Sequence, residues 1–502
     1  MDELKQKTRS TAVALSLDTL DQLPAGVGRP TYRRADLTPG IVHIGLGNFH
    51  RGHQAWYLHR LMQQGLALDW AIIGAGVRPG DARMRDSLLA QDCLTTLIEL
   101  DPAGISAEVI GSMIDFVPVE DGHRALITAM SDPQIRIVSL TVTEGGYYRD
   151  ASGALDMAHP DIVHDIAHPD TPRTAFGAMV AALRNRKQAG HAPFTGQSCD
   201  NLQGNGTILR QTLIGLARGI DPALAGWIDS EASFPNSMVD CIVPATGDAE
   251  RKRALALGVK DAAPVTHENF RQWVIEDDFC QGRPAWDLVG ATLTQDVHSY
   301  EAMKIRMLNA GHQVLANAGE ILGLPTIAAC MTDPQIAPFF RKVQITEIAP
   351  HVTAVPGITP DAYLDLITRR FSNPEIHDTT RRVAFDGSSR HAGFILPILR
   401  DALSAGTVVS GLALTEALWA RMCHGTREDG SVIEANDPIW SDLVTVAERA
   451  RTTPSEWLQQ SQIYGDLAQH DSFATAFEGW LALIWESGTR TALVEYLSQP
   501  YD

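Results

Sequence analysis

The stretch Ile41-Val-His-Ile-Gly45-Leu-Gly47-Asn-Phe-His50 decides the fold of this chain. A short apolar run ends in two glycines and continues into residues 55–62, where apolar side chains recur at helical spacing. Gly45 and Gly47 match the first two glycines of a GxGxxG turn, which permit a tight turn and a close approach of the backbone to a pyrophosphate. His50 replaces the third glycine, so a plain tight turn remains an alternative. The stretch predicts a strand–turn–helix unit that binds a dinucleotide, with contacts from Gly45, Gly47, Asn48, Phe49, His50 and Arg51.

Similar strand-like runs continue the pattern along the chain. Residues 70–74 and 135–142 are apolar and are followed by glycines, and residues 174–184 have helical spacing before a strand-like run at 194–198. Strands that alternate with helices are typical of a parallel sheet with helices on both faces. We therefore predict an α/β fold with a Rossmann-type doubly wound sheet.

The chain is long enough for two or three domains. Residues 1–40 are expected to be a peripheral extension of a dinucleotide-binding domain that covers 1–295. After about residue 296 strand signals fade, and amphipathic segments such as 412–422 and 473–485 predominate. Residues 296–502 are predicted to form a mainly α-helical substrate domain.

Composition excludes several classes of protein. A formal net charge of −19 argues against a broad nucleic-acid surface, because phosphate binding needs clustered Lys and Arg. No apolar run approaches the length of a membrane span, and the first forty residues lack a signal-peptide core. The six cysteines are scattered without a CxxC pair, which is typical of a reduced protein. We expect a cytoplasmic protein with no membrane or nucleic-acid partner, and, in the absence of a heptad seam, a monomer.

A second informative stretch is Lys304-Ile-Arg-Met-Leu-Asn309-Ala-Gly-His312. On an α-helix at about 100° per residue, His312 falls at about 80° and Asn309 at about 140° from Lys304, so the three polar groups share one side. Met303, Met307, Ala310 and Val314 cluster opposite as a packing stripe, while Leu308 and Leu315 lie within the polar arc. A lysine in such a half-desolvated place gives up its proton more readily and can act as a base. The other interpretation is a surface lysine beside a satisfied histidine.

An acid that binds the ribose is expected at the end of the second strand. In residues 74–81, Asp81 is a carboxylate able to accept a ribose 2′-hydroxyl and to repel a 2′-phosphate. Arg78 lies close by and would favour the phosphate, so NAD is the expected cofactor and NADP the alternative. Asp81 could instead be the N-cap of the helix that follows.

Four motifs taken together carry a resemblance to a known family. Residues 45–54 (GLGNFHRGHQ), 198–201 (SCDN), 234–240 (FPNSMVD) and 303–312 (MKIRMLNAGH) follow one another in the order of the long-chain mannitol dehydrogenase family. The resemblance covers the chain from about residue 30 to 495. It implies a metal-independent enzyme that oxidises a polyol at a secondary alcohol, as in mannitol at C2, to a ketose of the fructose type with NAD(P).

The resemblance also implies roles for individual residues. Lys304 is expected to be the general base, Asn201 and Asn309 to stabilise the developing oxyanion, and His312 to position the reacting hydroxyl. Glu144 is expected on a route for proton exchange. Two further pairs complete the expected site: Arg382 and Arg390 at the distal substrate hydroxyls, and Val239 and Asp240 at the nicotinamide end.

Two alternatives to a polyol dehydrogenase remain open. A hexuronate reductase of the same superfamily, acting on fructuronate or tagaturonate, would use Arg382 or Arg390 to hold a substrate carboxylate. A catalytically silent nucleotide-binding protein would bind the cofactor without turnover. A zinc enzyme is not expected, since His43, His50 and His53 lack suitable Cys or carboxylate partners.

Overall fold

The computed structural model describes residues 12–150 and 152–500. The chain forms two compact units, of which the first ends at His298 and the second begins at Ser299. This division lies close to the boundary expected between residues 295 and 296. All six cysteines are present as thiols, and Cys280 alone among them is exposed.

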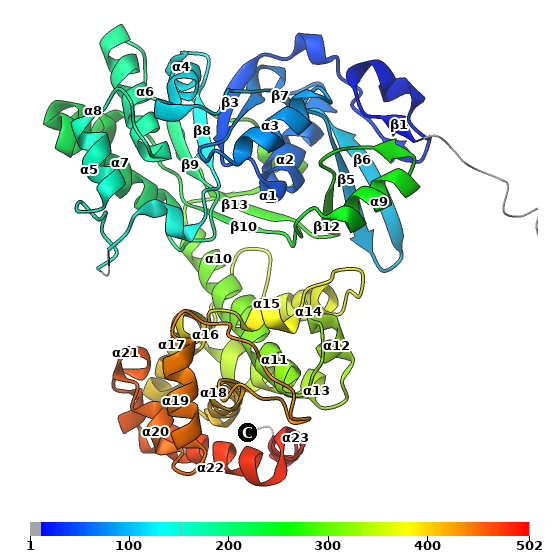
Figure 1. The fold of residues 1–502 in the computed structure, drawn as a ribbon, viewed down its shortest axis with the longest axis vertical. Helices are drawn as coiled ribbons and strands as arrows, with labels where there is room; N and C mark the ends of the chain where they lie inside the picture. Colours follow the sequence, from blue (N-terminus) through cyan, green and yellow to red (C-terminus); the bar gives the residue numbers. More distant parts are fainter. Residues whose placement is uncertain (1–11, 151, 501–502) are drawn as a thin grey trace, which may run out of the picture. The chain divides into compact units, whose positions relative to one another are not determined.

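The described part of the first unit is built on a five-stranded parallel sheet (Figure 1). Its strand order, β7-β4-β3-β8-β9, places the first strand of the motif at the centre, as in dinucleotide-binding folds. Val42 on β3 pairs with Ile73 on one side and Val138 on the other. The predicted doubly wound Rossmann-type fold is confirmed, with these strands: β3 (Pro39–Ile44), β4 (Ala71–Ala75), β7 (Met113–Phe116), β8 (Ile137–Leu140) and β9 (Thr195–Ser198).

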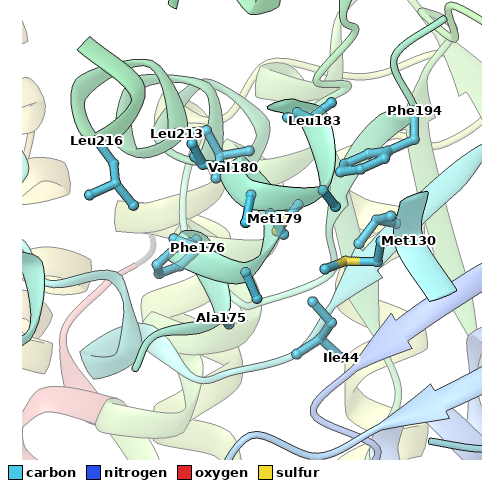
Figure 2. Packing of buried hydrophobic residues seen from close by; sticks show 14 of the residues in the cluster. Ile44, Met130, Ala175, Phe176, Met179, Val180, Leu183, Phe194, Leu213 and Leu216 are labelled. Carbon is cyan, nitrogen blue, oxygen red and sulfur yellow. The ribbon is translucent and has the colours of Figure 1, made fainter. Parts of the chain in front are cut away.

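Both faces of this sheet are buried, because successive side chains of a strand point to opposite faces. Val42 and Ile44 belong to one core, which is formed with helices α4 (Arg124–Ser131), α6 (Ala175–Ala189) and α7 (Asn205–Ile220). Figure 2 shows this packing, with Phe176, Met179 and Val180 of α6 among the residues drawn. Ile41 belongs to a second core on the other face, which includes Leu58 and Leu61 of α2 (Gln54–Met62). The remaining helices of this unit are α1 (Asn48–Gly52), α3 (Asp81–Leu89), α5 (Pro160–Ala167), α8 (Pro222–Glu231) and α9 (Asp248–Ala256).

Two smaller sheets and a strand pair were not anticipated from the sequence. One sheet has the order β12-β5-β6-β2, and the other has the order β10-β13-β14. The described part of the expected extension over residues 1–40 contributes short strands to these sheets, since β2 pairs with β6 and β1 pairs with β11. These strands are β1 (Val13–Ala14), β2 (Val27–Gly28), β5 (Thr95–Asp101), β6 (Gly104–Ile110), β10 (Ser237–Asp240), β11 (Val259–Lys260), β12 (Val265–Glu268), β13 (Gln272–Glu276) and β14 (Thr292–Thr294). Residues 1–11 of the expected extension lie outside the described residues.

The second unit is mainly helical, as predicted. Its centre is formed by α11 (Ala310–Ile321) and α18 (Ser410–Met422), which pack against each other, and α22 (Asp471–Ser487) packs on α18. No helix within the described ranges has the length and apolar character needed to cross a membrane. The other helices are α10 (Val297–Met303), α12 (Ile327–Thr332), α13 (Ile336–Val343), α14 (Pro360–Phe371), α15 (Thr380–Ala384), α16 (Gly387–Arg390), α17 (Leu396–Ala405), α19 (Trp440–Ala450), α20 (Ser455–Leu458), α21 (Ser461–Tyr464) and α23 (Thr489–Ser498).

The stretch that joins α10 to α11 is a π-helix over Lys304–Asn309, hereafter the π segment. The prediction of a regular α-helix is therefore wrong here, and the wider turn changes the angles between side chains. Leu308 and Leu315, expected within the polar arc, are buried, while Asn309 and His312 are half-buried. Within the described residues, two further π-helical segments, Gln344–Ile348 and His391–Ile395, pack against this one.

Candidate active site

The turn after β3 has two glycines with different requirements. Gly45 has a φ of +86°, and a Cβ there would lie 2.1 Å from the carbonyl oxygen of Thr141, so only glycine fits. Gly47 has an ordinary extended φ of −103°, and a Cβ there would meet no atom closer than 3.9 Å. The protein itself therefore does not require glycine at position 47. Open space at this turn is what a closely approaching pyrophosphate needs.

The side chains of Asn48 and Arg51 fix this turn to distant segments of the first unit. The Asn48 amide donates to the carbonyl of Pro244 and to the hydroxyl of Thr246, both at 2.8 Å. Arg51 is fully buried and donates to the Asn48 side chain at 2.8 Å and to the carbonyl of Ala263. These donors of Arg51 are directed to groups of the protein, and its contact with the phosphates stays a prediction.

His50 occupies the place of the third glycine as a packing residue. Its ring is buried and stacks on His43 with 3.4 Å between centroids and 15° between planes. Burial lowers the pKa of His50 to about 3, so the ring is neutral. His43 in turn is held by hydrogen bonds with Ser139 (2.8 Å) and Thr141 (3.0 Å). The buried imidazole of His50 therefore gives no support to its predicted contact with the cofactor. Phe49 is half-buried and stacks on His53 with 4.9 Å between ring centroids, and its contact with the cofactor stays a prediction.

Asp81 closes the loop that follows β4. It is the first residue of α3, and its Oδ2 accepts hydrogen bonds from the backbone N–H groups of Val77 and Arg78, both at 2.9 Å. A Cβ at Gly76 would lie 2.3 Å from the Asp81 Cβ, so the glycine makes room for this carboxylate. The alternative that Asp81 is the N-cap of this helix is wrong, because Gly80 holds that position and the Asp81 carboxylate bonds the preceding loop. Its contact with a ribose stays a prediction.

Asp200 organises the carboxyl ends of β8 and β9. Its carboxylate accepts from the backbone N–H groups of Val142 (3.1 Å) and Thr143 (2.8 Å) and from the Tyr147 hydroxyl (2.8 Å). Thr143 has a φ of +70°, which is strained for a β-branched residue, so the turn depends on these bonds. Asn201, the next residue, is exposed at the same edge of the sheet.

The turn that Asp200 holds leads into the 3-10 helix Glu144–Tyr147. The Glu144 backbone is therefore placed beside the sheet edge, while its side chain lies outside what the structure describes. Burial raises the pKa of Tyr147 well above its usual value, and its hydroxyl also bonds Ser198 at 2.6 Å. Val239 and Asp240 end β10 and are buried.

The remaining predicted residues belong to the second unit. Lys304 opens the π segment with 7% of its surface exposed, and Asn309 ends it half-buried. His312 follows in the first turn of α11, and its ring stacks on Phe371 at 4.1 Å and 19°. The structure thus places the predicted base, amide and imidazole along one continuous helical stretch. The role of Lys304 as the base stays a prediction.

The predicted pair Arg382 and Arg390 is accompanied by a carboxylate that the sequence reasoning missed. Arg382 donates from Nε to Oδ1 of Asp378 at 2.7 Å, and its Nη2 forms an ion pair with the same oxygen at 2.6 Å. Arg390 donates to the carbonyl of Val383 at 2.7 Å. The i,i+4 spacing of Asp378 and Arg382 is a charge-pair signal that could have identified the acid.

Comparison with known proteins identifies the family of this chain. Residues 39–288 match the family model for the mannitol dehydrogenase Rossmann domain, and residues 296–485 match the model for the mannitol dehydrogenase C-terminal domain. The chain is 57% identical to a mannitol 2-dehydrogenase of Cereibacter sphaeroides, over 94% of this chain and 99% of that protein. It is 38% identical to a mannitol 2-dehydrogenase of Phaeosphaeria nodorum, over 98% of this chain and 87% of that protein.

Solved structures give the same picture. The ternary complex of Pseudomonas fluorescens mannitol 2-dehydrogenase with NAD and D-mannitol matches with a TM-score of 0.86 and 39% identity, over 97% of this chain and all of that one. A substrate-free D-sorbitol dehydrogenase matches with a TM-score of 0.89 and 34% identity, over 95% of this chain and all of that one. The chain therefore belongs to the mannitol dehydrogenase family, a family of oxidoreductases.

Proposed function

We propose that this protein oxidises a polyol of the mannitol type at C2 to the corresponding ketose with NAD, and catalyses the reverse reduction. The observation that carries the proposal is the likeness to the Pseudomonas fluorescens enzyme, whose structure contains both NAD and D-mannitol. The open space at Gly47 supports a dinucleotide at the turn after β3. NAD, when bound, supplies an acceptor for the hydride that leaves the carbinol carbon.

The residues of this chain then accept the hydroxyl proton and stabilise the negative charge that develops on the oxygen. Lys304 acts as the general base that takes the proton of the reacting hydroxyl, and His312 holds that hydroxyl in position. As the C–H and O–H bonds break and the carbonyl forms, negative charge develops on the oxygen. Amide N–H donors from Asn309 and Asn201 stabilise this charge, a contribution of about 3 kcal/mol per well-placed donor. No metal is needed for this step, because the amides and the lysine carry the charge and the proton.

The distal part of the substrate is held by arginine. The Arg382 side chain is 60% exposed, so N–H donors other than those bound to Asp378 are accessible to hydroxyl groups. Arg390 lies partly buried beneath the end of α15 and adds a second cation. This same pair is the reason for a second candidate function, hexuronate reduction, in which a cation holds a substrate carboxylate.

A substrate panel tests the proposal. Reduction of NAD and of NADP is followed with mannitol, arabinitol and sorbitol, and oxidation of NADH is followed with fructose and fructuronate. We expect turnover with mannitol and fructose, and a preference for NAD, since Asp81 would repel a 2′-phosphate. Turnover with fructuronate alone would replace the proposal by the hexuronate reductase, and tight NADH binding without any turnover would indicate a silent relative. Sedimentation of the same preparation tests the expected monomer.

A further inference from the structure

Asp378 is a buried carboxylate next to two residues of the proposed substrate site. It lies just before α15, with 6% of its side chain exposed. Oδ1 accepts a hydrogen bond from Nε of Arg382 and forms an ion pair with its Nη2, and the Arg382 side chain is 60% exposed. One edge of the guanidinium is therefore anchored in the protein interior while its remaining N–H groups face outward. This anchoring restricts a long side chain to one orientation.

The other oxygen of the same carboxylate is directed at His312. Oδ2 lies 3.9 Å from Nε2 of His312, about one ångström beyond the usual hydrogen-bond length. The imidazole is held on its face by Phe371, at 4.1 Å between centroids. Asp378 thus lies between the residue proposed to hold the reacting hydroxyl and the residue proposed to hold the distal hydroxyls.

A comparison with Asp333 shows that Asp378 is not arranged for stability alone. Asp333 is equally buried and also pairs with an arginine, Arg490, but both of its oxygens are used: Oδ1 accepts from backbone N–H groups and Arg490, and Oδ2 accepts from Arg490 at 2.8 Å. Oδ2 of Asp378 is buried and has no hydrogen-bond partner among the described residues. Such a group costs stability, so it calls for an explanation other than folding.

The electrostatic surroundings of Asp378 agree with this view. Burial raises the pKa of its carboxyl, while Arg382, Arg390 and His377 lower it. The charges that face the carboxylate are thus the two predicted substrate arginines and a neighbouring histidine. Loss of the Asp378 charge would leave two guanidinium groups without the anion that separates them.

We propose that Asp378 is a positioning residue that orients Arg382 and His312 together towards the polyol. One buried carboxylate then sets the distance between the side chain that holds the reacting hydroxyl and the side chain that holds the distal hydroxyls. This inference rests on the proposed polyol dehydrogenase activity. It predicts that Asp378 acts on substrate recognition and not on cofactor binding.

The experiment compares Asp378→Asn with the control variant Asp333→Asn, because each replaces a buried aspartate that pairs with an arginine. With Asp378→Asn, KM for mannitol and for fructose rises at least about tenfold, KM for NAD and NADH stays within about twofold, and kcat falls less than KM rises. Asp333→Asn lowers the thermal midpoint but leaves every KM unchanged. Combining Asp378→Asn with Arg382→Ala raises KM no further than Arg382→Ala alone, because the two residues act as a unit.

A second variant covers the case in which Asp378→Asn does not fold. Arg382→Lys keeps the charge but loses the two-point contact with Oδ1, so it raises KM for mannitol to a similar extent. The inference is overturned if Asp378→Asn changes only the thermal midpoint, as Asp333→Asn does, or if Arg382→Lys is kinetically normal. A wild-type protein without turnover on any polyol would instead refute the proposed function, which separates the two failures.

Discussion

Replacing each glycine of the turn after β3 by alanine should separate its structural role from its ligand role. Gly45→Ala puts a Cβ 2.1 Å from the carbonyl oxygen of Thr141, at a φ of +86°. Left-handed backbone alone costs an L-residue about 1–2 kcal/mol, and the clash with a backbone oxygen adds to this, so we expect a loss of about 3 kcal/mol or more.

Gly47→Ala is the matched control within the same turn. Its φ of −103° suits any residue, and the new methyl group meets nothing within 3.9 Å. The unfolded chain loses conformational freedom, so the folded state should be unchanged or stabilised by about 0.4–1 kcal/mol. If the pyrophosphate lies against this backbone, however, the methyl group occupies its space, and the Kd for NADH should rise at least tenfold, or about 1.4 kcal/mol.

Thermal unfolding and a fluorescence titration with NADH measure the two effects. The expected pattern is a strongly lowered midpoint for Gly45→Ala, and a normal midpoint with weak NADH binding for Gly47→Ala. A Gly47→Ala protein that binds NADH as tightly as the wild type would refute the placement of the pyrophosphate at this turn. A normal midpoint for Gly45→Ala would show that the turn can rearrange.

Three further predictions concern other parts of the molecule. Lys304→Ala should lower kcat by about 10²-fold or more without changing NADH affinity, with partial rescue by added primary amines; more than a tenth of normal activity would exclude lysine as the base. Asp200→Asn should destabilise the strained turn at Thr143 by about 1–3 kcal/mol, because an amide cannot accept from all three donors, and an unchanged thermal midpoint would contradict this. Burial raises the pKa of Glu347 to about 7 from an ordinary value of 4.5, so the folded state holds this proton more tightly than the unfolded chain. The stability contributed by the protonated Glu347 is fully present below about pH 4.5 and is lost as the pH rises through about 7. The thermal midpoint of the wild type should therefore fall relative to that of Glu347→Gln over this interval. A difference in midpoint that does not change with pH would contradict the raised pKa.

The parallel sheet could be predicted because its strands are buried on both faces. Such strands are continuous apolar runs, as at β3 and β8, and each is followed by a turn rich in glycine or small residues. The hairpin of β5 and β6 was missed, since part of β6 is exposed and its apolar pattern is correspondingly weaker. The short strands β1 and β2 are defined by partners far along the chain, which local pattern cannot reveal.

Among the site residues, too, the local sequence motif could be predicted and the contacts with distant segments could not. The glycine motif correctly marked the turn, but Arg51 is bonded to Ala263, more than two hundred residues later in the sequence, and Asn48 to Pro244 and Thr246. Charged and polar residues next to a phosphate-binding motif invite a ligand interpretation, while the contacts that bury them come from distant segments. Asp378 was missed for the converse reason: its importance depends on which side chains converge on it in space.

The π segment gives a physical reason for the spacing of Lys304 and Asn309. In an α-helix, residues five apart lie about 140° apart around the axis, which would put Lys304 and Asn309 at the two limits of the expected polar arc. A π-helix bonds residue i to i+5, so residues five apart come closer to one side, and π-helical turns are frequent at functional sites. Lys304 and Asn309 are the first and last residues of this segment. The poorer backbone geometry is supported by packing, since Lys304, Met307 and Leu308 are buried and the segment contacts the π-helical segments Gln344–Ile348 and His391–Ile395. The π-helical turn therefore reduces the angle between Lys304 and Asn309 relative to a regular helix of the same sequence.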